Sequence, residues 1–315
     1  MGDSRGNASS SLSFILTGFP GLEDSLYWMF ILLGALYSVS ILGNSLILVI
    51  IKEEQSLHQP MYYFLAMLSI NDLCVNCSTL PTVLGTFCFN IREVDFDSCM
   101  AQMFFIHLFS WTESGILLAM SFDRYVAICN PLRYSALLTG SSTVKMGLAV
   151  LVRSFILILP VPLLLRRLPF CKANILHHAY CLHPDLIRLP CGDTTFNSLF
   201  GLSILVSTFG VDSLFIFLSY ILILRSILTI VSQTGRSKAL NTCVSHICAV
   251  LIFYIPMVGV SMIHRYGKQA PPFIHTLMSI IYLFMPPTLN PIIYSIKTKE
   301  IHKRMVKMLS RAKLC

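Results

Sequence analysis

Long apolar runs recur along this chain and constrain its fold more than any other feature. One of them, TCVSHICAVLIFYIPMVGVSMI, precedes His264 and contains no Lys, Arg, Asp or Glu. A helix that crosses the hydrocarbon core of a bilayer needs roughly 20 mostly apolar residues. Runs of this kind cover residues 26–51, 60–88, 101–129, 145–165, 196–224, 241–263 and 273–296. The sequence therefore predicts seven transmembrane helices, with Arg153 inside the fourth.

The composition indicates that lipid is the solvent of this chain. Apolar residues make up 55% of it and charged residues 12%, and the mean hydropathy is +0.72. Soluble domains carry about 25% charged residues, and a soluble core could not hide so much apolar surface. The sequence shows no repeat and no polar linker between two halves. We therefore expect an all-α membrane bundle at 26–296, after an extracellular segment at 1–25 and before a cytoplasmic tail at 297–315.

The distribution of Lys and Arg predicts the orientation of the bundle. Basic residues exceed acidic ones clearly on the side of the C-terminus and balance them on the other side, and Lys and Arg collect in cytoplasmic segments. The N-terminus is therefore expected outside, where Asn7-Ala8-Ser9 forms a glycosylation acceptor. Five cysteines cluster on that side, where disulfides persist, although spacing alone does not decide which of them pair: Cys88, Cys99, Cys171, Cys181 and Cys191. The basic surplus suits an anionic membrane surface rather than nucleic acid.

Four motifs carry a resemblance to a known family. LHQPMYYFLAMLSIND ends at Asp72, MSFDRYVAICNPLRY closes the third span, SKALNTCVSHICAVLIFY opens the sixth and PPTLNPIIYSIKTKEI closes the seventh. Together they resemble the olfactory receptor branch of the rhodopsin-like G-protein-coupled receptors, over residues 18–301. FPGLE and HAYCLHPD look like the class I subset, family 51, and Ser121 departs from the usual alanine of the third-span motif.

The resemblance implies an odorant receptor that activates a heterotrimeric, stimulatory G protein and raises cyclic AMP, in the plasma membrane of olfactory cilia. It also implies disulfides Cys99–Cys181 and Cys171–Cys191, and no cofactor. One alternative is a receptor for an internal metabolite outside olfaction. Another is a transporter, which predicts inverted repeats or broken helices in matched halves that the sequence lacks. No G-x-S-x-G, H-E-x-x-H or phosphate-loop motif suggests an enzyme.

Asp123-Arg124-Tyr125 lies at the inner end of the third span and has two interpretations. It is either a charged helix end among headgroups or, as the resemblance implies, a switch. In the switch, Arg124 is held by Asp123 at rest and released to the G protein. The motif residues that would rearrange with it are Tyr220, Asn290, Pro291 and Tyr294. Pro291 removes a backbone hydrogen bond and favours a hinge, and 297–313 favours a basic amphipathic helix on the inner leaflet.

Asp72 and Glu113 are carboxylates inside spans. They are either protonated acids hydrogen-bonded to neighbours such as Asn44 and Asn290, or part of a sodium site like that of related receptors. Glu113 lies 11 residues before Arg124, which is about 20° from the same helical face, so both should face the bundle interior together.

Arg265 is the first charge after the sixth span, and it is either a snorkelling helix-end arginine or a ligand anchor. Its helical phase matches Tyr254, Met257, Val258 and Ser261. The resemblance to class I receptors implies small acids as ligands, and Arg suits a carboxylate because its planar fork binds both oxygens.

The predicted ligand site comprises residues from four spans: Arg265, Ser261, Val258, Met257, Tyr254, His107, Ser110, Trp111, Leu205 and Ile280. Trp111 has the alternative of packing on a neighbouring helix, and Arg265 that of pairing with the acidic loop at 93–97. We expect His264, one residue off this face, among headgroups. Three loop histidines, His177, His178 and His183, raise the alternative of zinc, but their irregular spacing favours a solvated loop.

Overall fold

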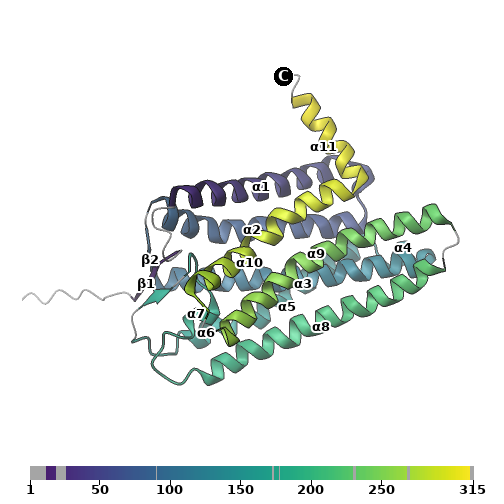
Figure 1. Cartoon of the computed structure of the whole chain (residues 1–315). Helices are drawn as coiled ribbons and strands as arrows, with labels where there is room; N and C mark the ends of the chain where they lie inside the picture. Colours follow the sequence, from purple (N-terminus) through teal and green to yellow (C-terminus); the bar gives the residue numbers. More distant parts are fainter. Residues whose placement is uncertain are drawn as a thin grey trace, which may run out of the picture.

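The computed structural model describes residues 12–18, 26–89, 91–171, 174–176, 178–229, 232–267 and 270–312. Long helices run side by side and form a bundle (Figure 1). Their bounds are α1 (Leu26–Glu53), α2 (Pro60–Cys88), α3 (Phe96–Cys129), α5 (Gly140–Ile158) with α6 (Pro160–Leu165), α8 (Thr195–Leu228), α9 (Gln233–Tyr266) and α10 (Pro272–Lys297). Each falls on one of the seven predicted spans, so the all-α membrane bundle is confirmed. The acceptor at Asn7 lies outside the described residues.

Six of the described helical segments are long and apolar enough to cross a membrane. The remaining span, α2, has 29 residues and packs against both α1 and α3. Its hydropathy is lowered by polar residues such as Asp72, Asn71 and Asn76, which are buried inside the bundle. Helix α2 therefore spans as a bundle member although its composition is the least lipid-like.

Several helices extend beyond the apolar runs that predicted them. Helices α3, α8 and α9 have 34 residues each, which is about 51 Å at 1.5 Å per residue, against about 30 Å of hydrocarbon. The excess is polar or charged helix outside the lipid, such as the start of α9 at Gln233. The fourth span instead divides into α5 and α6 at Leu159, because Pro160 and Pro162 interrupt the backbone hydrogen bonds.

A small sheet covers one end of the bundle, which we call the sheet end. Strands β1 (Ser13–Leu16), β2 (Glu93–Asp95) and β3 (Ile175–Leu176) lie in the order β2-β1-β3. Strand β1 is antiparallel to β2 and parallel to β3. The helix α7 (His183–Leu186) lies at the same end, and disulfides Cys99–Cys181 and Cys171–Cys191 tie its loop to α3 and to itself. The described residues of the loop 166–194 thus form a lid that the two disulfides hold in place.

The opposite end carries η2 (Gln55–Leu57), α4 (Pro131–Leu137) and α11 (Lys299–Ala312) (Figure 1). Helix α11 contacts α1 and α10, and Arg304 pairs with Glu54. This α11 end is the one that the charge distribution predicts to be cytoplasmic.

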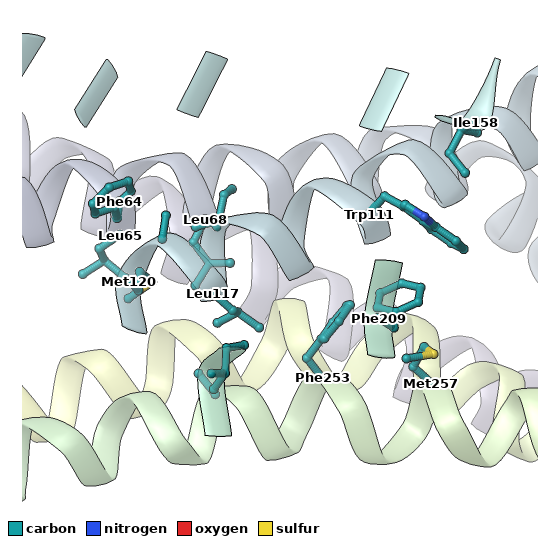
Figure 2. Close-up of a cluster of buried hydrophobic side chains, with 14 of the residues drawn as sticks. Phe64, Leu65, Leu68, Trp111, Leu117, Met120, Ile158, Phe209, Phe253 and Met257 are labelled. Carbon is teal, nitrogen blue, oxygen red and sulfur yellow. The ribbon is translucent and has the colours of Figure 1, made fainter. Parts of the chain in front are cut away.

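Helix α3 is the centre of the bundle. Of its most apolar stretch, 72% is buried, against at most 50% in the other five described helices that are long and apolar enough to cross a membrane. Figure 2 shows Trp111 of α3 meeting Phe209 of α8, with Phe253 and Met257 of α9 beside them. The ring centroids of Trp111 and Phe209 are 4.5 Å apart. Aromatic packing of this kind holds three helices together below the lid.

Candidate functional site

A cavity of about 720 Å³ opens at the sheet end, between the lid and helices α3, α5, α6, α8 and α9. We call it the sheet-end cavity. Its lining includes five of the predicted ligand residues: His107, Trp111, Leu205, Ser261 and Arg265. The α-helical phase of α9 brings Ser261 and Arg265 to the same face, one turn apart. Trp111 satisfies both of its predicted roles, since it lines the cavity and packs on Phe209.

The charge of this cavity is positive. Its described lining contains Arg188 and Arg265 and no carboxylate. The acidic loop does not supply a partner for Arg265, because Glu93 accepts a hydrogen bond from Ser13 and Asp97 pairs with Arg166. Among the described residues, no carboxylate lies within ion-pair distance of Arg265. Of the two partners left open for Arg265 by the sequence, the acidic loop therefore does not contact it in the described structure.

Two histidines face each other across the cavity. His107 uses its Nδ1–H to donate to the Met103 carbonyl at 2.8 Å, which leaves its Nε2 for another partner. The lid residue His183 lies 6.3 Å away, between ring centroids. Burial, with the positive charge of nearby groups such as Arg265, lowers the pKa of His183 to about 3. The sequence analysis assigned His183 to a solvated loop, which is wrong, because the disulfides press the lid into the bundle.

The other predicted ligand residues lie elsewhere. Tyr254 and Met257 sit deeper, in the core with Phe209. Ser110 is bonded to Tyr282 of α10, and Ile280 belongs to a second buried cluster with Tyr180 of the lid. Val258 is 48% exposed on the outside of the bundle. A residue directly after Met257 is turned by 100°, so the prediction that Val258 lines the cavity is wrong.

Below the cavity, a polar chain crosses four helices. The Arg153 guanidinium donates to both oxygens of Asp212, at 2.9 and 2.8 Å. Ser114 also donates to Asp212, at 2.8 Å, and is 2.9 Å from the Tyr254 hydroxyl. Because the Ser114 proton is engaged by Asp212, Tyr254 is the donor in that last contact. Arg153 therefore faces the interior of the bundle. Its position inside the fourth span did not by itself decide the direction of the side chain.

A second polar group joins Asp72, Glu113 and Asn290 in the middle of the bundle. The Asn290 amide donates to Asp72 at 3.2 Å and to Glu113 at 3.4 Å. Asn44 donates instead to the carbonyls of Ser40 and Pro287. Oδ1 of Asp72 is buried and has no hydrogen-bond partner among the described residues. Two acidic groups and an unsatisfied oxygen fit a small cation such as sodium, as well as they fit a shared proton.

At the α11 end, a cavity of about 960 Å³ is lined by Arg124, Asp123, His246, Tyr294 and residues of α2 and α9. We call it the α11-end cavity. Arg124 donates to Asp123 through Nε at 2.9 Å, and Tyr134 of α4 donates to the other Asp123 oxygen at 2.9 Å. Burial, with the adjacent Asp123 charge, raises the pKa of Tyr134, so its hydroxyl remains a donor. The arginine is thus held by Asp123.

His246 is a contact at this end that the sequence analysis missed. Its Nδ1 meets the Tyr220 hydroxyl at 2.6 Å and its Nε2 meets the Leu117 carbonyl at 3.0 Å. Since a carbonyl only accepts, Nε2 carries the proton and Tyr220 donates to Nδ1. This histidine ties α9 to α3 and α8. Tyr294 lines the same cavity, and its buried hydroxyl has no hydrogen-bond partner in the part of the chain that the structure describes. Tyr125 packs against the hydrophobic core.

Comparison with known proteins places this arrangement in a class. Squid rhodopsin matches with a TM-score of 0.75 at 15% sequence identity, covering 92% of this chain and 86% of that chain. This identity shows the fold alone: the seven-helix bundle of the rhodopsin-like G-protein-coupled receptors.

The sequence relatives narrow the class to a family. A sequence profile described as olfactory receptor matches residues 33–312. Human olfactory receptor 51I2 is 57% identical over 98% of this chain and 99% of its own, and human olfactory receptor 51I1 is 58% identical over 94% and 95%. The chain belongs to the olfactory receptor family, and its relatives confirm the family 51 resemblance. It is a multi-pass membrane receptor for a small molecule that couples to a G protein, and not an enzyme.

Proposed function

We propose that this receptor detects small carboxylic acid odorants through Arg265 and raises cyclic AMP through a stimulatory G protein. The observation that carries the proposal is the charge of the sheet-end cavity, which contains two arginines and no carboxylate in its described lining. An unpaired guanidinium inside a cavity favours an anionic ligand, and its planar fork matches a carboxylate. His107 and Ser261 can donate to or accept from the same head group, from α3 and α9.

The apolar part of the lining would hold the alkyl chain. Trp111, Leu205 and Ile204 line the cavity, so affinity should rise with chain length until the cavity is filled. The best small ligands gain at most about 1.5 kcal/mol per heavy atom. An acid of about six heavy atoms therefore reaches about 9 kcal/mol at most, which corresponds to a Kd of about 0.3 μM at best.

A ligand that bridges α9 to α3 and the lid shifts the receptor toward the state that it binds better. In our proposal the inner end of α9 then moves away from α3. That movement breaks the His246 bridge and frees Arg124 for the G protein. The receptor acts in the plasma membrane of sensory cilia, with α11 on the anionic inner leaflet, where basic residues such as Arg304 favour the surface.

The test is a cyclic AMP assay over a series of straight-chain acids, with alcohols and methyl esters of equal length. We expect acids alone to activate. Arg265→Ala should lower potency about 10- to 100-fold, since a hydrogen bond to a charged group contributes about 1.5–3 kcal/mol. Arg265→Lys should retain part of the response. The control is Arg167→Ala, an exposed lid arginine.

Equal potency for acids in the Arg265→Ala variant and the parent, at equal surface expression, refutes the anchoring role. Equal responses to acids and their esters refute the acid class itself. A receptor for an internal metabolite uses the same chemistry, and transcript location separates it from an odorant receptor.

A further inference from the structure

Three buried side chains from the lid and α9 converge at the sheet end. They are His178 and Asp185 of the lid and His264 of α9, with exposed fractions of 2%, 8% and 4%. His178 Nε2 lies 3.0 Å from Asp185 Oδ2, and His264 Nε2 lies 3.2 Å from Asp185 Oδ1. One ligand atom from each residue lies within 4.8 Å of the others. The sequence analysis placed His264 among headgroups and His178 in a solvated loop, and both predictions are wrong.

The hydrogen bonds around the two imidazoles determine which ring nitrogen of each histidine faces the Asp185 carboxylate. His264 Nδ1 faces the Val260 carbonyl at 2.8 Å, and a carbonyl only accepts, so Nδ1 carries the proton. His178 Nδ1 faces Ser279 Oγ at 3.2 Å, and that hydroxyl already donates to the Thr276 carbonyl. Nδ1 of His178 is therefore the donor as well. In both neutral rings the Nε2 lone pair is directed at the Asp185 carboxylate.

Lone pairs directed at a carboxylate repel it unless a cation lies between them. Among the described residues, Asp185 Oδ2 and His264 Nε2 are buried without a well-aligned hydrogen bond, although His264 Nε2 lies within ion-pair distance of Asp185 Oδ1. Burying such groups unsatisfied costs stability, because their interactions with water are lost without replacement. A positive charge between the rings and the carboxylate, either a proton on each Nε2 or one bound metal ion, would satisfy these groups.

We propose that His178, Asp185 and His264 bind a divalent transition metal, with Zn²⁺ as the ion, and that the metal fastens the lid to α9. Two imidazoles and one carboxylate are ligands that zinc accepts at about 2.0–2.1 Å. Tetrahedral ligands at that distance lie about 3.3 Å apart, close to the two contacts of 3.0 and 3.2 Å. Both histidine–carboxylate separations therefore already suit a tetrahedral ion, and the ligand atoms of all three residues lie within 4.8 Å of one another.

The surroundings support the same ligand set. Val260 and Ser279 provide the outer hydrogen bonds that orient metal-bound histidines through the second ring nitrogen. The nearby cation Arg188 is bonded to the His264 carbonyl rather than to a ligand atom. His264 also lines the sheet-end cavity, so the fourth zinc position can take water from that side, as in other zinc sites with three protein ligands.

The first experiment uses the full chain, purified in lipid nanodiscs and stripped of metal with a chelator. We expect one Zn²⁺ per receptor and a higher melting temperature with Zn²⁺, because an ion that binds only the folded state stabilises it. X-ray absorption should show nitrogen and oxygen ligands at about 2.0–2.1 Å and no sulfur at about 2.3 Å. Sulfur ligands, or less than one bound ion, overturn the proposal.

Variants identify the ligands. His264→Gln and Asp185→Asn keep hydrogen-bonding capacity but should lower zinc affinity about 100-fold or more, since even outer-shell changes cost about 10- to 100-fold. His264→Cys should restore binding and add one sulfur ligand, which reports on the site even if His264→Gln fails to fold. Ser279→Ala should cost about tenfold.

His302→Ala, which removes an exposed histidine of α11, is the control and should bind like the parent receptor. Zinc affinity that is unchanged in His264→Gln, or a His264→Cys receptor without a sulfur ligand, shows that the ion binds elsewhere. Zinc binding does not require an odorant, so the result stands apart from the proposed acid recognition.

Discussion

The pair of Arg153 and Asp212 gives the sharpest test of what holds this bundle together. Arg153 contacts both carboxylate oxygens, and Asp212 is almost fully buried, with 1% of its side chain exposed. Arg153→Met removes the cation and leaves the carboxylate with one described donor, Ser114. Breaking a buried ion pair from one side costs about 3–5 kcal/mol, because the remaining charge is uncompensated.

We expect the lower end of that range, about 3 kcal/mol, because 35% of the Arg153 side chain remains exposed. A loss of 3 kcal/mol corresponds to a fall of about 6 °C in melting temperature for a chain of this size. The double variant Arg153→Met/Asp212→Leu should recover to within about 1 kcal/mol of the parent, since an apolar pair of similar volume replaces a buried ion pair at little cost.

The assay is thermal unfolding of receptor in nanodiscs, followed by a thiol-reactive dye or by loss of the monomer peak. Arg133→Met, at an exposed arginine of α4, controls for the loss of one cation and should leave the melting temperature unchanged. The single variant Asp212→Leu completes the comparison. If the double variant loses as much melting temperature as the two single variants added together, Arg153 and Asp212 stabilise the fold independently. The reasoning from an uncompensated carboxylate then fails.

Three further changes test other contacts. Gly115→Ala places a Cβ 2.5 Å from Val150 Cγ1; it should destabilise by about 1–3 kcal/mol in the same thermal assay, and Val150→Ala should reverse most of the loss. His246→Phe removes the bridge from α9 to α3, and since such a bond contributes about 1 kcal/mol, ligand-free cyclic AMP should rise about fivefold; unchanged basal signalling would contradict this. Asp72→Asn should abolish any shift of odorant potency by sodium, measured against potassium at equal ionic strength.

The helix bundle was predictable from the sequence because each of its spans is marked by a long, uninterrupted run of mostly apolar residues. The α2 bounds, Pro60–Cys88, agree with the apolar run, since Pro60 starts the helix at its first turn. The helix ends that lie beyond the apolar runs were not predictable, because apolar content marks lipid and helical hydrogen bonds continue past it into water. The start of α9 at Gln233, for example, lies in a polar segment that no hydropathy pattern separates from loop.

The site was predictable where one helix decides the geometry. Phase along α9 correctly brought Ser261 and Arg265 to one cavity. It missed His246 because a histidine in an apolar run gives no sign of its partners, Tyr220 and the Leu117 carbonyl, which come from two other helices. Contacts between helices depend on how each helix is rotated about its own axis and how deep it lies in the membrane. A single sequence gives neither quantity.

His264 shows why phase alone misjudges a residue beside a lid. It is one position, or 100°, from Arg265, and in a bare bundle that rotation would turn it toward headgroups. The Cys99–Cys181 disulfide draws the lid down onto α3, which brings Asp185 within 3.2 Å of His264. The environment of the α9 end is therefore set by a segment about 80 residues earlier in the chain. Fastening the lid converts the side of α9 next to Arg265 from a lipid-facing position into a buried one, and it does so through cysteines whose spacing did not reveal their pairing.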